Sequence, residues 1–191
     1  MRIFVLGAGA SGSYLAQLLA RQGHQVTCGD RDPERARRFL GKKSLLTVVQ
    51  ANARNVRSVV RAARGCHLLV NASPAKFNES ALRAALRLRA HYIDLSAHMV
   101  RNPFKAEQLA YAKRFAEKRR VAVINAGVAP GLTNLLVARS VELLDQADTV
   151  YIRLYESADG DAPVSQWSAE GSFDEAVSRP RVFRDGRFHL A

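Results

Sequence analysis

The chain has few cysteines and no long apolar run. Only 2 of its 191 residues are cysteines, Cys28 and Cys66. Both fall in predicted buried strands with another strand between them, which favours small core residues over a disulfide or a metal pair. No apolar run approaches the roughly 18 to 20 residues that a membrane span needs. Met1-Arg2 leads directly into a strand, unlike a signal peptide. We therefore expect a cytoplasmic protein that does not enter a membrane.

Acidic residues are also scarce, and their scarcity is local. The chain has 17 Asp and Glu residues and 29 Lys and Arg residues, which gives a formal net charge of +12. Residues 1–135 carry +16 of net charge and residues 136–191 carry −4. Most basic residues are arginines three or four positions apart on predicted helices, typical of a solvated surface. An electrostatic funnel for an anionic cofactor or a carboxylate substrate is a second interpretation. Nucleic-acid binding is disfavoured, because aromatic residues are not interleaved with the basic ones.

Chemistry-bearing side chains show no spacing typical of a metal site or a hydrolytic triad. Four of the 5 histidines are not paired with cysteine, carboxylate or serine at the required intervals; they are His24, His67, His91 and His189. We expect no metal site.

A glycine motif follows the first apolar run of the chain. The run Ile3-Phe4-Val5-Leu6 is followed by Gly7, Gly9 and Gly12 in a GxGxxG pattern. Gly7 suits a tight turn, Gly9 the close approach of a pyrophosphate, and Gly12 the packing of a helix on a strand. The amides that include Ala10 and Ser11 would bind the phosphates at the helix N-terminus. The sequence therefore predicts a dinucleotide-binding βαβ unit.

The second apolar run ends in a carboxylate. Asp30 lies 18 residues beyond Gly12, close to the spacing of about 20 expected of an acid that binds ribose hydroxyls. Asp30 therefore favours NAD, while the neighbouring Arg31 could accept the 2′-phosphate of NADP or stack on adenine. A helix cap or loop acid is the alternative interpretation of Asp30.

Residues 1–135 alternate between apolar strands and helical segments. This pattern predicts a doubly wound, parallel α/β sheet of about six strands, the Rossmann arrangement. The strands are expected at 2–6, 25–29, 45–49, 66–71, 91–95 and 121–125. Helix starts are predicted at Asp32-Pro33, Asn55, Asn78 and Asn102-Pro103.

Residues 136–191 have a different pattern and predict the start of a second, incomplete α+β substrate domain. A helix expected at 132–144 leads into it. Residues 148–155 alternate like a strand, a short helix is expected near 172–177, and 181–189 predicts a hairpin around Asp185-Gly186. About 55 residues are few for an independent core, so this segment should lean on the first domain or on another chain.

Several later motifs, in order along the chain, resemble the saccharopine dehydrogenase family, and most closely its lysine 6-dehydrogenase branch. They are the segments 68–74, 77–79, 91–95, 125–134 and 167–175. Family members commonly run to about twice this length. The resemblance therefore suggests a truncated chain, which works as a homo-oligomer or with a completing polypeptide.

The resemblance implies an NAD(P)-dependent oxidoreductase that transfers hydride between a nicotinamide and the C–N bond of an amino-acid-derived amine. It also implies that the predicted strand ends converge on the cofactor. Asn71, Ala72, Ser73 and Pro74 would contact ribose or nicotinamide, as would Asn125 and Gly127. A plain structural turn is the alternative for residues 71–74.

Two residues are candidates for catalysis. Asp94 could polarise the amine or bind a substrate ammonium, or could cap the next loop. His98 could carry a proton near neutral pH, or could be an ordinary loop histidine.

Two other functions remain open. The first 40 residues also resemble the nucleotide-sensing domains that regulate potassium transport, in which ligand binding shifts an assembly and nothing is oxidised. A truncated, inactive relative is the other possibility.

Overall fold

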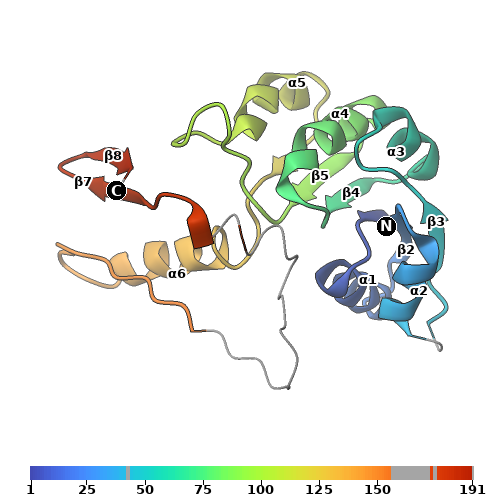
Figure 1. Ribbon diagram of the computed structural model, residues 1–191, viewed down its shortest axis with the longest axis horizontal. Helices are drawn as coiled ribbons and strands as arrows, with labels where there is room; N and C mark the ends of the chain where they lie inside the picture. The colour runs from blue at the N-terminus through green and yellow to red at the C-terminus, as the bar shows by residue number, and fades with distance from the viewer. Residues whose placement is uncertain (42–43, 156–172, 174–175, 191) are drawn as a thin grey trace.

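The computed structural model describes residues 1–41, 44–155, 173 and 176–190 (Figure 1). Its main body is a six-stranded sheet in the order β3-β2-β1-β4-β5-β6, in which all neighbours are parallel. The strands are β1 Arg2–Leu6, β2 Gln25–Asp30, β3 Thr47–Gln50, β4 Leu68–Asn71, β5 His91–Asp94 and β6 Ala122–Val123. The chain thus has the predicted doubly wound α/β, Rossmann-like fold.

The helices are α1 Ala10–Arg21, α2 Pro33–Leu40, α3 Val56–Ala62, α4 Asn78–Leu88, α5 Ala112–Glu117 and α6 Leu132–Val141, with 3-10 turns η1 Ala75–Phe77 and η2 Glu107–Tyr111. The first five, α1 to α5, cover both faces of the sheet. In Figure 1, α3, α4 and α5 lie above the sheet and α1 and α2 below it, while α6 extends to the side. The right-handed crossovers of a parallel sheet place the first and second halves on opposite faces.

The alternation of β1 divides the core in two. Ile3 and Val5 pack with Val70 and with α1 and α2, whereas Phe4 and Leu6 pack with Leu69 and with α3, α4 and α5. A strand buried on both faces reads as a continuous apolar run, which is why 2–6 was correctly predicted.

Side-chain caps begin two of the predicted helices. Asp32 Oδ1 accepts a hydrogen bond from the Arg35 amide (3.0 Å) before α2. Asn55 Oδ1 accepts from Arg57 (2.9 Å) and Ser58 (3.1 Å) before α3. These predictions are confirmed, and each satisfies amides that a helix start leaves without partners.

One predicted helix start is present but is not capped as predicted, and another is wrong. α4 begins at Asn78, but its N-cap is Phe77, and the fully buried Asn78 side chain bonds to Asn71 and Ser96 instead. Asn102 starts no α-helix: its Oδ1 accepts from the Phe104 amide (2.8 Å) in a turn, and η2 begins only at Glu107. An asparagine can turn the backbone without starting a helix.

The segment after α6 corrects another prediction. Residues 148–155 form no strand and expose their side chains, since alternation cannot make a strand without a partner. The 181–189 hairpin is present as β7 Arg181–Arg184 and β8 Arg187–Leu190, an antiparallel pair. Its Phe188 ring stacks on Phe104 at 5.8 Å. Of the helix expected near 172–177, residues 172, 174 and 175 lie outside the described part, and the division at residue 135 stays a prediction.

Both cysteines are free. Cys28 is buried in β2, while Cys66 is partly exposed and precedes β4 rather than lying in a strand as predicted. In the described ranges, no helix has the length and apolar character to cross a membrane.

Truncating Leu69 should destabilise the sheet at its centre. Leu69 is 0% exposed and Leu45 is 101% exposed. We expect Leu69→Ala to lower the free energy of unfolding by about 2–5 kcal/mol because it leaves a cavity, and Leu45→Ala to change it by less than about 0.5 kcal/mol. Urea unfolding followed by circular dichroism measures both, and equal losses would contradict the core assignment.

Candidate functional site

The turn between β1 and α1 requires two of its three motif glycines for packing. Gly7 has φ +91°, and a Cβ there would lie 2.8 Å from Ala72 O and Ser73 N. A Cβ on Gly12 would lie 1.9 Å from Gly7 O. Both residues therefore let the turn close against the end of β4.

Gly9 is different, because no packing requires it. Its φ of −75° suits any residue, and a Cβ there would meet nothing within 4 Å. Gly9 is the N-cap of α1 and offers no side-chain cap. The first intrahelical bond runs from Ser13 N to Gly9 O (2.9 Å), so the amides of residues 10–12 precede the helical ladder. Open space thus faces a helix N-terminus, as an anionic group requires.

Asp30 closes this cradle from β2. Its Oδ2 accepts from the Ala8 amide (2.8 Å) and its Oδ1 from the Asp32 amide (3.0 Å). Asp30 therefore fixes the glycine turn, and each oxygen keeps a lone pair for a further donor. Arg31, the next residue, is exposed. The predicted cofactor residues of β1, α1 and β2 are thus brought together.

The segment 71–74 contacts the same turn, but not through its asparagine. Asn71 is 1% exposed. Its Nδ2 donates to Asn78 Oδ1 (2.8 Å), and its Oδ1 accepts from the Ser73 amide (3.2 Å). Ala72 and Ser73 lie against Gly7, and Pro74 is exposed beyond them. Asn71 itself is committed to the protein interior, so a contact with a ligand would have to come from residues 72–74.

Asp94 is a fully buried carboxylate, 0% exposed. Its Oδ1 accepts from the Asn125 amide (2.7 Å), and its Oδ2 accepts from Tyr92 Oη (3.0 Å) and from Gln108 Nε2 (3.3 Å). Burial raises the pKa of Asp94, although these three donors oppose the rise. The contacts tie β5 to η2 and to the segment after β6. With no exposed surface, Asp94 has no direct contact with the crevice, and its catalytic role stays a prediction.

Asn125 and Gly127 build the turn after β6. Asn125 has φ +61°, and a Cβ on Gly127 would lie 2.2 Å from Leu95 O. Both line a cavity of about 510 Å³ that also includes Val123, Pro130 and Leu135. This turn therefore packs on the end of β5 while one side of it stays open.

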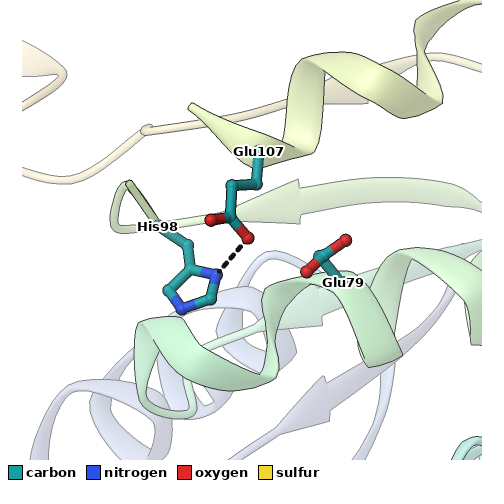
Figure 2. A group of neighbouring side chains, drawn as sticks. All are labelled: Glu79, His98 and Glu107. Carbon is teal, nitrogen blue, oxygen red and sulfur yellow. Dashed lines mark ion pairs between the residues drawn. The ribbon is translucent and has the colours of Figure 1, made fainter. Parts of the chain in front are cut away.

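His98 is held by a buried glutamate that the sequence analysis did not identify. His98 Nδ1 lies 3.1 Å from Glu107 Oε2, an ion-pair distance but not a hydrogen bond, and the side chains are 17% and 6% exposed (Figure 2). The Glu107 amide donates to His98 O (2.9 Å), and the His98 amide donates to Gln108 Oε1 (3.3 Å). The loop at His98 is therefore fixed to η2, and the catalytic role of His98 stays a prediction.

Glu79 completes a cluster with His98 and Glu107. One ligand atom from each lies within 4.8 Å of the others. Arg101, however, already supplies a cation: its guanidinium is 2.9 Å from Glu79 Oε1 and 3.0 Å from Glu107 Oε2. The Arg101 hydrogen bond is the main cause that lowers the pKa of Glu107 to about 2. The residues form an ion-pair network as they stand, and the absence of a metal stays a prediction.

Tyr92, Gln108 and Glu107 were missed for different reasons. Tyr92 and Asp94 are two residues apart in a strand and so share one face, a signal that was available in the sequence. Gln108 and Glu107 reach the site only because η2 folds back on the loop at 98–101, and no local pattern predicts that approach.

The chain matches a known protein family and is similar in fold to solved structures. Residues 3–124 match the family described as "Saccharopine dehydrogenase NADP binding domain". The fold is similar to apo saccharopine dehydrogenase (L-Glu forming) from Saccharomyces cerevisiae, with a TM-score of 0.64, 15% identity, and coverage of 74% of this chain and 31% of that one. The chain thus spans about a third of the yeast enzyme.

A partial similarity connects the chain with UDP-N-acetylglucosamine 3-dehydrogenase from Acidithiobacillus ferrooxidans. The TM-score is 0.48 at 18% identity, covering 65% of this chain and 38% of that one.

Replacing Asp94 with asparagine should have a pH-dependent cost. Because the folded pKa of Asp94 is raised, the folded state holds its proton longer than the unfolded state, so this carboxyl's contribution to stability falls as pH rises. Asp94→Asn removes that dependence and also sets an amide against the Gln108 donor, at a cost of about 1–3 kcal/mol. We therefore expect a larger loss in the free energy of unfolding at pH 4.5 than at pH 7.5. Urea unfolding of both proteins at the two pH values measures it, and a larger loss at pH 7.5 would contradict the raised pKa.

Proposed function

This chain belongs to the saccharopine dehydrogenase NADP-binding domain family, and we propose that it forms the cofactor half of an NAD(P)-dependent oxidoreductase. The proposed reaction moves hydride between a nicotinamide and the C–N bond of an amino-acid-derived amine, with the lysine 6-dehydrogenase type as the specific candidate. The family match over residues 3–124 supports a nicotinamide-binding domain of dehydrogenase type. The amine substrate is our inference.

The cradle at Gly9 is the observation that carries this proposal. A Cβ at Gly9 would touch nothing, while Gly7 and Gly12 are required by packing. The packing of the turn therefore does not by itself explain why residue 9 is a glycine with open space beside it. The amides of residues 10–12 at the start of α1 precede the first intrahelical bond, from Ser13 N to Gly9 O, and the Asp30 carboxylate accepts from the adjacent Ala8 amide. A dinucleotide fits this arrangement, with its pyrophosphate on the amides and a ribose near the carboxylate.

The choice between NAD and NADP depends on Asp30 and Arg31. We infer a preference for NAD, because a 2′-phosphate would approach the Asp30 carboxylate, which already holds the Ala8 amide and cannot turn away without releasing the glycine turn. Arg31 is exposed and would offset that repulsion in part.

The chemistry needs one hydride and one proton to leave the amine. The nicotinamide, when bound, would supply the hydride acceptor. A base must take the proton from the amine nitrogen, and water would then hydrolyse the resulting imine. His98 is the best-placed base: Glu107 lies beside Nδ1 at 3.1 Å, which leaves Nε2 on the far side of the ring (Figure 2). The backbone of the loop is held to η2 by hydrogen bonds at both His98 N and His98 O, which fixes where the imidazole stands.

In this scheme Asp94 would not touch the substrate but would hold other residues of the site in place. Its hydrogen bonds with Gln108 and Asn125 hold η2, and with it His98, against the turn after β6. We assign Asp94 the role of a positioning residue for these elements.

Gly9→Ala should separate cofactor binding from folding. The added methyl group meets no protein atom within 4 Å, so the melting temperature should stay within about 2 °C of the wild type. It would occupy the space proposed for the pyrophosphate, so the affinity for NADH and NADPH should fall at least about tenfold. Fluorescence titration of the reduced cofactors measures this. Gln22→Ala is the control, since Gln22 is exposed and lies at the far end of α1 from the cradle. Unchanged affinity in Gly9→Ala would contradict the cradle.

His98→Gln should remove turnover and spare cofactor binding. Loss of a general base lowers kcat by about 10²- to 10⁴-fold, while NADH affinity should stay within about twofold. The assay offers NAD and NADP with lysine, saccharopine and related amines to the protein in its natural assembly, and follows reduced-nicotinamide absorbance; His24→Gln is the control. Full activity in His98→Gln would contradict its role. Cofactor binding without reduction by any amine would favour a regulatory nucleotide-binding module.

A further inference from the structure

A second cavity lies at the opposite edge of the sheet from the cofactor cradle. Its volume is about 420 Å³, and its lining includes Arg2, His67, Arg89, His91 and Arg120. These residues stand at the amino ends of β1, β4 and β5 and just before β6. No acidic residue belongs to the described lining, which is unusual for three neighbouring guanidinium groups.

Backbone contacts fix the tautomers of the two histidines. The Arg2 amide donates to His67 Nδ1 (3.3 Å), and the Val121 amide donates to His91 Nδ1 (3.1 Å). A neutral imidazole that accepts at Nδ1 carries its proton at Nε2. The His91 amide also donates to His67 O (2.8 Å), so the two residues are neighbours across β4 and β5. Each histidine therefore offers an N–H donor beyond its backbone contact.

Two of the arginines are anchored by Nε. Arg2 Nε donates to Gly65 O (2.6 Å), and Arg120 Nε donates to Arg89 O. Anchoring through Nε orients each guanidinium and leaves terminal N–H groups for another acceptor, although Arg120 also donates one to Arg119 O (2.9 Å). Arg89 closes the rim in the left-handed conformation, with φ +52°.

The lining favours a negatively charged ligand. An anion among the three guanidinium groups would lower their mutual repulsion, which water screens in part at the exposed Arg2 and Arg89. Arginine forks and imidazole N–H groups match the oxygen atoms of phosphate and carboxylate. The concave shape and limited volume suit a small molecule better than a long polyanion.

We propose that this cavity binds a small multivalent oxyanion, a phosphate-bearing or polycarboxylate metabolite, at a site separate from the cofactor cradle. The site explains part of the basic excess of residues 1–135. It does not depend on the oxidoreductase function proposed above.

Arg89→Asn is the most selective variant for testing this site. Asparagine tolerates the left-handed conformation, so the fold should be kept, which a thermal melt checks. Isothermal titration of the full chain with inorganic pyrophosphate and with citrate should detect binding, and Arg89→Asn should weaken it at least about tenfold through loss of charge-assisted hydrogen bonds. Arg87→Gln, which removes the same charge from an exposed position on α4 outside the lining, should change affinity by less than about twofold.

The outcomes separate the possible sources of binding. Pyrophosphate tighter than citrate identifies a phosphate ligand, the reverse order identifies a polycarboxylate, and either one with this Arg89 dependence supports the site. As a second measurement, the imidazole NMR signals of His67 and His91 should shift on addition of the tighter probe. The proposal is overturned if neither anion binds below about 10 mM, if Arg87→Gln loses as much affinity as Arg89→Asn, or if binding is unaffected by Arg89→Asn, which would place the anion elsewhere.

Discussion

The buried carboxylate of Asp94 is the constraint on which the carboxyl edge of the sheet depends. Removing a charge from water is costly unless hydrogen bonds replace its hydration. Here the replacement comes from three segments far apart in the sequence: Tyr92 in β5, Gln108 in η2 and the Asn125 amide after β6. None of them can move away without leaving Asp94 unsatisfied. The loop that carries His98 is attached to the same η2, so one buried charge fixes the position of the residue that we propose to move a proton.

The glycine turn between β1 and α1 shows a second constraint, which is the room that each glycine leaves for neighbouring atoms. Gly7 and Gly12 have to be glycine so that the turn can pack, whereas Gly9 keeps a space open without any protein contact that requires it. The distinction separates residues that build the site from one that leaves room in it. The GxGxxG pattern alone does not make this distinction, since it weights its three glycines alike.

Strong local signals made much of the fold predictable from the sequence. The strands of a parallel sheet are apolar on both faces, and β1 is bounded as predicted. Asp32 and Asn55 begin helices because their side chains have only local backbone to bond. Asn78 and the 148–155 segment show where local inference stops. The Asn78 side chain bonds to Asn71 and to the Ser96 carbonyl instead of its own helix, and residues 148–155 have strand alternation but pair with no strand that the structure describes. The partner of His98 was unpredictable for the same reason, since Glu107 reaches it only through the return of η2.

The two outermost strands of the sheet are paired on one side only. β3 lies at one end and β6 at the other. β6 is two residues long, pairs with β5 alone, and is flanked by Val121, which is 59% exposed, while its own Val123 is 45% exposed. Local stability follows the density of buried contacts, and β1 and β4 hold the densest part of the core. The buried contacts therefore decrease from the centre of the sheet toward β6, and we expect the amide protons of β6 to exchange with solvent before those of β1 and β4.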